Sequence, residues 1–434
     1  MRKIPKKVVI TIIIVLISIV LIASLVFSFV SKHHGEVKEG GRRAEIEVNG
    51  TIISNEISQN INQDNEVKEI ENNASEVAKT EIVDGEKLAE LVNMNDLFGK
   101  YYDKAKDILN TMTLEEKVGQ MFLVRYPEED ANKEIKENNP GGYILFGRDF
   151  KNETSESILE KLNNNQVNSK VKMFFGVDEE GGTVVRVSEY QQFRTSKFKS
   201  PGQLFDEGGI DRIIEDSHEK TNLLKGLSLN MNLVPVADIA DNQSAYIYDR
   251  TIGKSAEETA EYVRNLVKVM NEDKIISTMK HFPGYGDNID THTGIAVDNR
   301  EYLEFEKVDF LPFKSGIEEG VPTILVNHNV VNCMDSNLPA SLSDNVHRIL
   351  REDLKFSGII MTDDLAMDAV KSYVENGQAV VQAVLAGNDL IITSDFAKQK
   401  EEVLEAVKQG KITQNVINRA VIRILACKLA YNII

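Results

Sequence analysis

The sequence predicts an α/β protein whose main domain, residues 96–434, is a (β/α)8 barrel of the TIM type. Short apolar runs alternate along this part of the chain with longer amphipathic patterns, which is the rhythm of a parallel sheet covered by helices. Eight such units across about 340 residues favour a closed barrel, because an open doubly wound sheet usually has fewer strands. An apolar segment and a polar linker precede the barrel.

The first 30 residues predict a membrane anchor. Residues 8–30 contain no charged side chain, and as a helix this run measures roughly 34 Å at about 1.5 Å per residue, enough to cross a bilayer. Residues 1–7 contain Arg2, Lys3, Lys6 and Lys7 and no acid, so the positive-inside rule keeps them cytoplasmic and places the rest of the chain outside the cell membrane. A cleaved signal peptide is the alternative, but the apolar run is long for one and no A-x-A site comes after it.

Residues 31–95 predict a disordered, acidic polar tether. They are rich in Glu, Asn, Ser and Gln and contain no proline or aromatic residue. Such a composition buries too little apolar surface to fold by itself. Only the stretch Val83–Val92 is expected to form a helix, which docks on the barrel domain. The linker is therefore expected to act as a spacer that gives the barrel reach.

Helix and strand signals alternate from residue 96 onward. Thr113 and Glu116 form a capping box, which starts a helix through Gln120. Helical patterns between the strands include Ala256–Asn271, Val308–Glu318 and Asp368–Ala386. The expected strands are short runs rich in apolar and β-branched residues: Phe122–Tyr126, Tyr143–Phe146, Met173–Val177, Asn232–Val236, Ile275–Met279, Thr323–Val326, Ile359–Met361 and Leu390–Thr393.

Charge and cysteine content exclude several classes of function. A net charge of -18 with a pI near 5.0 repels phosphate backbones, so nucleic acid is not expected as a partner. Cys333 and Cys427 are too few for a disulfide framework and too isolated for a zinc site. We expect two free, mostly buried thiols and a partner that is small or neutral.

One loop, Lys280–Gly294, gathers charged and imidazole groups directly after an apolar strand. It reads K-H-F-P-G-Y-G-D-N-I-D-T-H-T-G, and Pro283 with the glycines prevents strand or helix from continuing. Asp290 and His292 are one residue apart, so a turn can pair carboxylate with imidazole and stabilise the imidazolium that proton transfer requires. The alternative is a solvated turn with a surface histidine.

Further reactive side chains come directly after the other predicted strands. A barrel builds its active site from the carboxyl ends of its strands, whereas a random scatter would place many of these groups in the middle of helices. The set therefore favours an enzyme over a scaffold. Its members after the third to seventh strands are Asp178–Gly182, Asp238, Lys280 with His281, Asn327 with His328, and Asp363 with Asp364.

Residue types suggest how this set acts. Asp363, held ionised by nearby cations, can attack an electrophilic carbon, and Lys280, Arg186 and Arg250 are the candidate neighbours, which can also bind substrate hydroxyls. A second group must protonate the leaving oxygen. Most retaining glycosidases use another carboxylic acid, and here Asp290 with His292 offers that function.

Structural roles remain open for single members of the set: Asp363 as a helix cap, Asp178 as a solvated acid and His328 as a buried core histidine. Gly181, Gly182, Gly284 and Gly286 are expected to let the chain pass close to a bulky ligand.

A metal-dependent hydrolase is the first competing chemistry, with His281, His292, His328 and Asp363 as potential zinc ligands. No H-x-H closes the first strand and no H-E-x-x-H lies on a helix, so no metal is expected. No phosphate-binding glycine motif comes after a strand, and no nucleotide cofactor is expected.

Taken together, the motifs of residues 105 to 430 resemble those of family-3 glycoside hydrolases, specifically the single-domain β-N-acetylglucosaminidases that act on cell-wall sugars. The resemblance rests on five segments in the same order. They are M-T-L-E-E-K-V-G-Q-M at 112–121, G-V-D-E-E-G-G-T-V-V-R at 176–186, D-R-T-I-G at 249–253, K-H-F-P-G at 280–284 with D-T-H at 290–292, and M-T-D-D-L-A-M at 361–367.

The resemblance implies a role for each matching residue. Asp363 is implied as the catalytic nucleophile and His292 as the acid/base, with Asp290 orienting the imidazole. The residues implied to hold the sugar are Asp178, Arg186, Arg250, Lys280 and His281. The implied reaction is retaining hydrolysis of a terminal β-linked N-acetylglucosamine through a covalent glycosyl-enzyme, without a cofactor.

Other readings of the same residues stay open. A neutral histidine donor repels phosphate less than a carboxylate does, so a β-glycoside phosphorylase is one alternative, and a β-glucosidase on the same site is another. A membrane-tethered sugar-binding protein without turnover is the non-enzyme alternative. Retention of Asp290, His292 and Asp363 together favours the enzyme.

Overall fold

A computed structural model describes residues 82–434 except 241, 287, 289–295, 367–369 and 371–377. It also gives the backbone of two short strands in a separate unit, Met1–Lys68, where β1 (Glu47–Val48) pairs antiparallel with β2 (Thr51–Ile52). The expected anchor at 8–30 and most of the expected tether at 31–95 lie outside the described residues. Among the helices that are described, none has the length and apolar composition that a bilayer crossing requires.

Eight parallel strands form the barrel, in the order in which they occur along the chain. The ring closes where Met361 of the seventh strand meets Leu390, the residue before the eighth, in a parallel bridge. The eight predicted strands are thereby confirmed. Their observed bounds are β3 (Phe122–Arg125), β4 (Gly142–Leu145), β5 (Phe174–Val177), β6 (Met231–Asn232), β7 (Ile276–Phe282), β9 (Thr323–Val326), β11 (Ile359–Thr362) and β12 (Ile391–Thr393).

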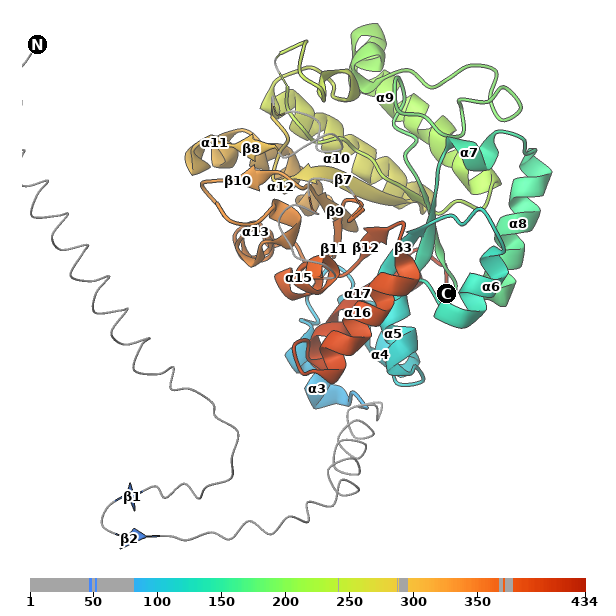
Figure 1. Cartoon of the computed structure of the whole chain (residues 1–434). Helices are drawn as coiled ribbons and strands as arrows, with labels where there is room; N and C mark the ends of the chain where they lie inside the picture. The colour runs from blue at the N-terminus through green and yellow to red at the C-terminus, as the bar shows by residue number, and fades with distance from the viewer. Residues whose placement is uncertain are drawn as a thin grey trace, which may run out of the picture. The chain divides into compact units, whose positions relative to one another are not determined.

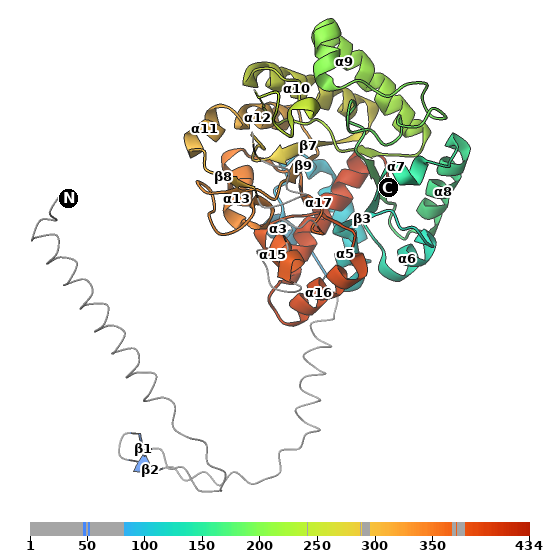
Figure 2. The same cartoon turned by 45° about the horizontal axis from the view of Figure 1, so that its top comes forward.

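Helices cover the outside of this ring, as Figure 1 and Figure 2 show from two directions. Strands enclosed on both faces are buried along their whole length, as in β4, β5, β9 and β11, which is why each reads as a continuous apolar run. The helices are α3 (Gly85–Leu91), α4 (Tyr102–Leu109), α5 (Leu114–Gln120), α6 (Ala131–Asn138), α7 (Gly147–Phe150), α8 (Ser155–Asn168), α9 (Pro201–Gly226), α10 (Ala256–Asp273), α11 (Tyr302–Lys307), α12 (Phe310–Glu318), α13 (Asp344–Arg348), α15 (Gln378–Ala386), α16 (Phe396–Lys408) and α17 (Gln414–Ala430).

Shorter elements complete the fold. A second pair of parallel strands, β8 (Val297–Asp298) and β10 (Val330–Val331), lies outside the ring. The predicted capping box is present at α5, where the Thr113 hydroxyl accepts from Glu116 N and Glu116 Oε2 accepts from Thr113 N. The single-turn elements are η1 (Gly99–Tyr101), η2 (Tyr248–Arg250), η3 (Ala340–Leu342) and the π-turn η4 (Ile349–Asp353).

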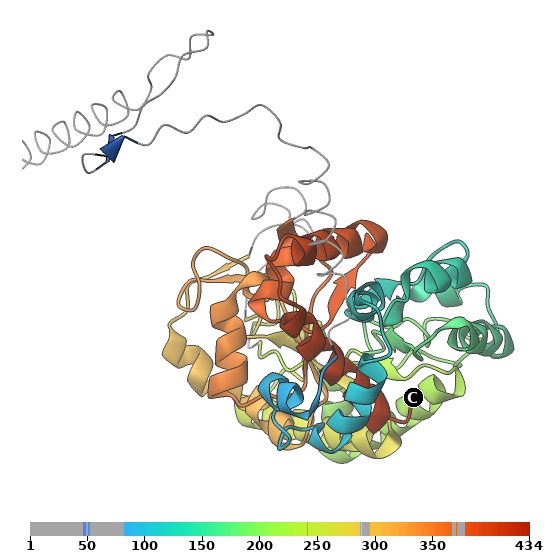
Figure 3. The same cartoon turned by 90° about the horizontal axis from the view of Figure 1, so that it is seen from below.

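The amino-terminal end of the barrel is covered by α17 together with α3 and α4. In Figure 3, α17 (dark red) crosses the ring beside the blue and cyan helices. The buried ammonium of Lys428 on α17 donates to Gln120 Oε1 and Gly141 O, which precede β3 and β4. The helix expected at Val83–Val92 is confirmed as α3, and Leu88 and Leu91 are buried in the core.

The two cysteines differ in their surroundings. Cys427 lies on the buried side of α17, as expected, but Cys333 is exposed, so the expectation of two buried thiols is wrong for this residue. Cys333 comes shortly after β10 in a connecting segment outside the ring, where side chains are not enclosed by a second layer of structure.

Candidate active site

The polar side chains expected at the strand ends all lie at the carboxyl end of the barrel. Asp178 comes directly after β5, Lys280 and His281 are among the last residues of β7, and Asp363 comes directly after β11. Because the strands are parallel, their carboxyl ends share one face, and this face is where barrel enzymes build their sites.

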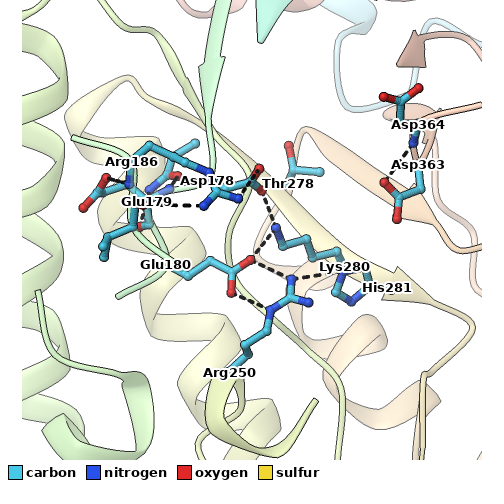
Figure 4. Close-up of polar contacts among 12 residues, drawn as sticks. Asp178, Glu179, Glu180, Arg186, Arg250, Thr278, Lys280, His281, Asp363 and Asp364 are labelled. Carbon is cyan, nitrogen blue, oxygen red and sulfur yellow. Dashed lines mark hydrogen bonds and ion pairs between the residues drawn. The ribbon is translucent and has the colours of Figure 1, made fainter. Parts of the chain in front are cut away.

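A buried cluster of two carboxylates and two cations forms the centre of the site (Figure 4). Lys280 Nζ lies 2.6 Å from Asp178 Oδ1 and 2.6 Å from Glu180 Oε1. Arg250 donates to the same Glu180 carboxylate from Nε at 2.9 Å and from Nη2 at 2.8 Å. The bidentate geometry fixes the orientation of the guanidinium as well as its position.

Glu180 remains ionised although it is almost fully buried. Burial alone raises the pKa of a carboxyl group, but the charges of Arg250 and Lys280 outweigh it and hold the pKa of Glu180 well below its usual range. The same pairing raises the pKa of Arg250 against the effect of its burial. Glu180 and Arg250 therefore form a charged pair at neutral pH.

His281 is held by Asp238, the acid shortly after β6. Asp238 Oδ2 accepts from His281 Nδ1 at 2.6 Å and from His281 N at 3.1 Å. His281 Nε2 lies 3.3 Å from Arg250 Nη2, which has only hydrogens to offer. The hydrogen of the imidazole is thus on Nδ1, and Nε2 is an acceptor.

Asp178 and Arg186, which lies beside the cluster, expose more of their side chains than the rest of the cluster does. Their side chains are 14% and 26% exposed, with 3.8 Å between Asp178 Oδ2 and Arg186 Nη2. Glu179 stabilises the loop that contains Arg186. Its Oε2 accepts from the backbone N–H of Arg186 at 2.8 Å and from that of Val187 at 2.7 Å. Asp178 and Arg186 can therefore meet the hydroxyl groups of a ligand, whereas Glu179 and Glu180 form the support.

Asp363 stands at the same barrel end on a different strand, apart from the charged cluster in Figure 4. Its backbone N–H donates to Val326 O at 3.2 Å, and its Oδ1 accepts from Asp364 N at 2.8 Å. Burial raises the pKa of the neighbouring Asp364. The turn after β11 is thus fixed by hydrogen bonds to β9 and within itself.

His328 is a core histidine and not a surface group. It is fully buried, its Nε2 donates to Asp364 O at 3.1 Å, and its Nδ1 accepts from the Ser341 hydroxyl at 2.7 Å. Of the alternatives open in the sequence, the structural one applies to this residue. Through Asp364, His328 helps to hold the turn that presents Asp363.

Asp290 and His292 lie outside the described residues, so their expected pairing stays a prediction. The residues on either side are described: Asn288, and the stretch that begins at Ala296. The structure thus brings together Asp178, Arg186, Arg250, Lys280 and His281, and places Asp363 at the same end of the barrel.

The glycines after β5 are packed closely against the protein itself. Gly181 and Gly182 both have positive φ angles, +107° and +63°. A methyl group on Gly181 would overlap the carbonyl oxygen of Lys199, and one on Gly182 would come within 2.7 Å of Ser200 Cβ. Their close approach therefore serves the packing of the loop against the segment that leads into α9.

The zinc alternative has little geometric support. Both ring nitrogens of His281 and of His328 are engaged by protein groups. Among the residues that the structure describes, no three His, Cys, Asp or Glu side chains are grouped so as to hold a metal ion.

Two functional residues were not assigned a role by sequence reasoning, although both were seen to lie after strands. Glu180 holds two cations, and Asp238 holds His281 and the backbone N–H of Tyr285 at 2.7 Å. Their position shortly after β5 and β6 was the available signal. Their partners lie 43 to 100 residues away in sequence, which no local pattern reveals.

Comparison with known proteins identifies the family. Residues 113–427, well over half of the chain, match the model described as the glycosyl hydrolase family 3 N terminal domain. The chain belongs to glycosyl hydrolase family 3. It is a glycoside hydrolase, and the resemblance inferred from its motifs is confirmed.

Comparison with individual relatives supports the assignment to family 3. It is 28% identical over 273 residues to a beta-hexosaminidase of Nitrosomonas eutropha, covering 62% of this chain and 77% of the relative. It is 29% identical over 274 residues to a beta-hexosaminidase of Hydrogenovibrio crunogenus, covering 61% and 75%. The structure of a family 3 β-N-acetylglucosaminidase from Paenibacillus superimposes with a TM-score of 0.69 at 29% identity, covering 74% of this chain and 63% of that one.

Proposed function

We propose that the chain is a retaining β-N-acetylhexosaminidase that removes terminal β-linked N-acetylglucosamine from cell-wall or related glycans. The observation that supports this most is the charged cluster of Asp178, Glu180, Arg250 and Lys280 at the same barrel end as Asp363. Names of the relatives, two beta-hexosaminidases and a β-N-acetylglucosaminidase, support the choice of sugar.

In the proposed binding step, Asp178 and Arg186 hydrogen-bond the hydroxyl groups of the sugar. Asp178 can accept two such bonds while Lys280 holds its other oxygen in place, and Arg186 supplies N–H donors in a planar fork. Glu180, Arg250 and His281 hold this edge rigid from behind. A rigid edge matters because catalysis depends on placing the anomeric carbon within attack distance of the nucleophile.

In the proposed chemical step, Asp363 attacks the anomeric carbon and the bond to the leaving oxygen breaks. His292, oriented by Asp290, donates its proton to that oxygen. The product is a glycosyl ester on Asp363, which water then hydrolyses while His292 accepts a proton, so the configuration is retained after two inversions.

Hydrolysis of an aryl β-N-acetylglucosaminide by the wild type and by Asp363→Asn tests this proposal. We expect the variant to lose at least about 10³-fold in kcat, because it lacks the nucleophile. Asp107→Asn, the same change at an exposed position on α4, is the matched control and should keep full activity. Trapping of a glycosyl adduct on Asp363 by mass spectrometry and a β-configured first product would support retention.

Three outcomes would contradict it. An inverted first product excludes the glycosyl-enzyme, and release of sugar 1-phosphate in phosphate buffer identifies a phosphorylase. Sugar binding without turnover of any β-glycoside by the wild type identifies a binding protein.

For localisation, the proposal is a single-pass membrane protein divided into residues 1–7 inside, 8–30 as the anchor, 31–95 as the linker and 96–434 as an extracytoplasmic barrel. The uncharged run at 8–30 and the basic residues before it support this. After carbonate extraction of cell membranes, the protein should stay in the pellet. Recovery of a freely soluble mature protein would refute the anchor.

A further inference from the structure

A second cluster of charges lies behind the K-H-F-P-G-Y-G segment, outside the sugar-binding edge. Its centre is Arg300, whose guanidinium makes a bidentate contact with Asp298, at 3.1 Å from Nε to Oδ1 and at 2.8 Å from Nη2 to Oδ2. Arg300 Nη1 donates to Asp309 Oδ2 at 2.9 Å, and its plane packs on the Phe305 ring at 4.1 Å. The two acid side chains are only 2% and 1% exposed.

This cluster joins two stretches of chain that flank the segment bearing Asp290 and His292. On the leading side, Asn288 Nδ2 donates to Tyr285 O and to Asp298 Oδ2, both at 2.8 Å. On the trailing side, Asp298 belongs to β8, which pairs with β10 through the bond from Val330 N to Ala296 O. The carboxylate of Asp298 is thus a shared acceptor for both ends of the segment.

Two glycines allow the cluster to approach the loop. Gly284 has a φ of +133° and Gly286 a φ of +56°. A methyl group on Gly284 would overlap Asp309 Oδ1, and one on Gly286 would come within 2.9 Å of Arg300 Cζ. These glycines therefore permit the close passage of Asp309 and Arg300.

The same loop is continuous with the sugar-binding edge. His281 and Tyr285, on either side of Gly284, are both bound by Asp238. The loop is therefore held from one side by Asp238, which also binds His281, and from the other by Arg300 and Asp309. Residues 281–286, which precede the segment bearing His292, are thus held from both sides.

We propose that Arg300, with Asp298 and Asp309, is a positioning cluster that fixes the two ends of the segment bearing His292 and so aligns the proton donor with the leaving oxygen. This rests on the proposed function, in which His292 is that donor. Fixing the two ends of a short segment removes most of the conformations open to it. A misplacement of about 1 Å in a catalytic group can cost about 10²-fold in rate.

The test separates proton donation from folding by varying the leaving group. A 2,4-dinitrophenyl β-N-acetylglucosaminide departs without a proton, whereas a leaving group with a high pKa, such as a second sugar, needs one. We expect Arg300→Lys to lower kcat/KM for the disaccharide about 10- to 100-fold more than for the dinitrophenyl substrate. Asn288→Ala, which removes only the bridging amide, should show the same bias if Arg300→Lys fails to fold.

Arg351→Lys is the matched control. Arg351 also forms a buried pair with an acid, Asp389 Oδ2 at 2.5 Å, and is similarly exposed, but it binds the carbonyl oxygens of Phe356 and Gly358 just before β11, at the opposite end of the barrel. Its replacement should lower kcat/KM for both substrates by the same factor or leave both values unchanged.

Equal loss on both substrates in Arg300→Lys and Asn288→Ala would overturn the inference and leave a purely structural cluster. His292→Ala distinguishes this from failure of the proposed function. If His292→Ala spares the dinitrophenyl substrate and the Arg300 and Asn288 variants show no bias, only the positioning role is wrong. If His292→Ala shows no bias either, both proposals fail.

Discussion

Neutralising Glu180 should destabilise the barrel far more than neutralising a comparable acid on the surface. In Glu180→Gln the carboxylate that binds two buried cations becomes a neutral amide of the same shape. Lys280 keeps the charged partner Asp178 at 2.6 Å, whereas Arg250 loses the carboxylate that it contacts directly and keeps a neutral amide oxygen and the contact with His281 at 3.3 Å. One buried guanidinium thus loses its counter-charge, which costs about 3–5 kcal/mol.

Urea unfolding at 25 °C measures this cost. The matched control is Glu219→Gln, because Glu219 also forms a two-point contact with an arginine, Arg194, but its side chain is 51% exposed. Solvent screens that pair, and its loss should cost less than about 1 kcal/mol. In the double variant Glu180→Gln/Arg250→Met the unpaired cation is absent. Its loss of unfolding free energy should therefore be about 2–3 kcal/mol smaller than the sum of the losses in the two single variants.

Two results would refute this reasoning. If Glu180→Gln costs no more than Glu219→Gln, burial adds nothing to the pair. If the costs of the Glu180 and Arg250 variants simply add, the two side chains do not depend on each other for their stability.

The other predictions concern the loop behind the site. Gly284→Ala should cost about 2–4 kcal/mol in unfolding free energy, because a side chain is strained at this φ and overlaps Asp309. Gly226→Ala, at a helical glycine with open space around it, is its control and should be neutral or slightly stabilising; equal losses would contradict the steric argument. Burial raises the pKa of Asp309 to about 7 although Arg300 lowers it. A raised folded-state pKa stabilises the fold below about pH 4, and this contribution is lost as the pH rises to 7, by about 1.4 kcal/mol per unit. The advantage of the wild type over Asp309→Asn should therefore shrink by about 4 kcal/mol between about pH 4 and about pH 7.5, and a pH-independent difference would disprove the shift.

The barrel strands could be predicted because a strand that is buried on both faces consists largely of consecutive apolar residues. β9 and β11 are buried four-residue runs, T-I-L-V and I-I-M-T, that are followed directly by polar residues. β8 and β10 were not predicted. Each has only two residues, which is too short to show a strand pattern in the sequence.

The candidate site was predictable as a set of positions but not as a network. A strand end tells where Asp178, Lys280 and Asp363 lie, because the topology of a parallel barrel fixes which end of each strand faces the mouth. Which cation binds which acid depends on contacts between segments far apart in the chain. Arg250 and Glu180 are 70 residues apart. The role of Arg300 was not predicted, because Arg300 does not directly follow a barrel strand.

The docking of α3 has a practical consequence for any use of the enzyme. Leu97, shortly after α3, donates its backbone N–H to Ser357 Oγ, two residues before β11 begins. The chain thus enters the barrel at the base, whereas Asp178, Lys280 and Asp363 open at the rim. A bead attached directly at α3, at the base of the barrel, should leave the rim free on the opposite side, so that long glycans reach it as readily as short ones.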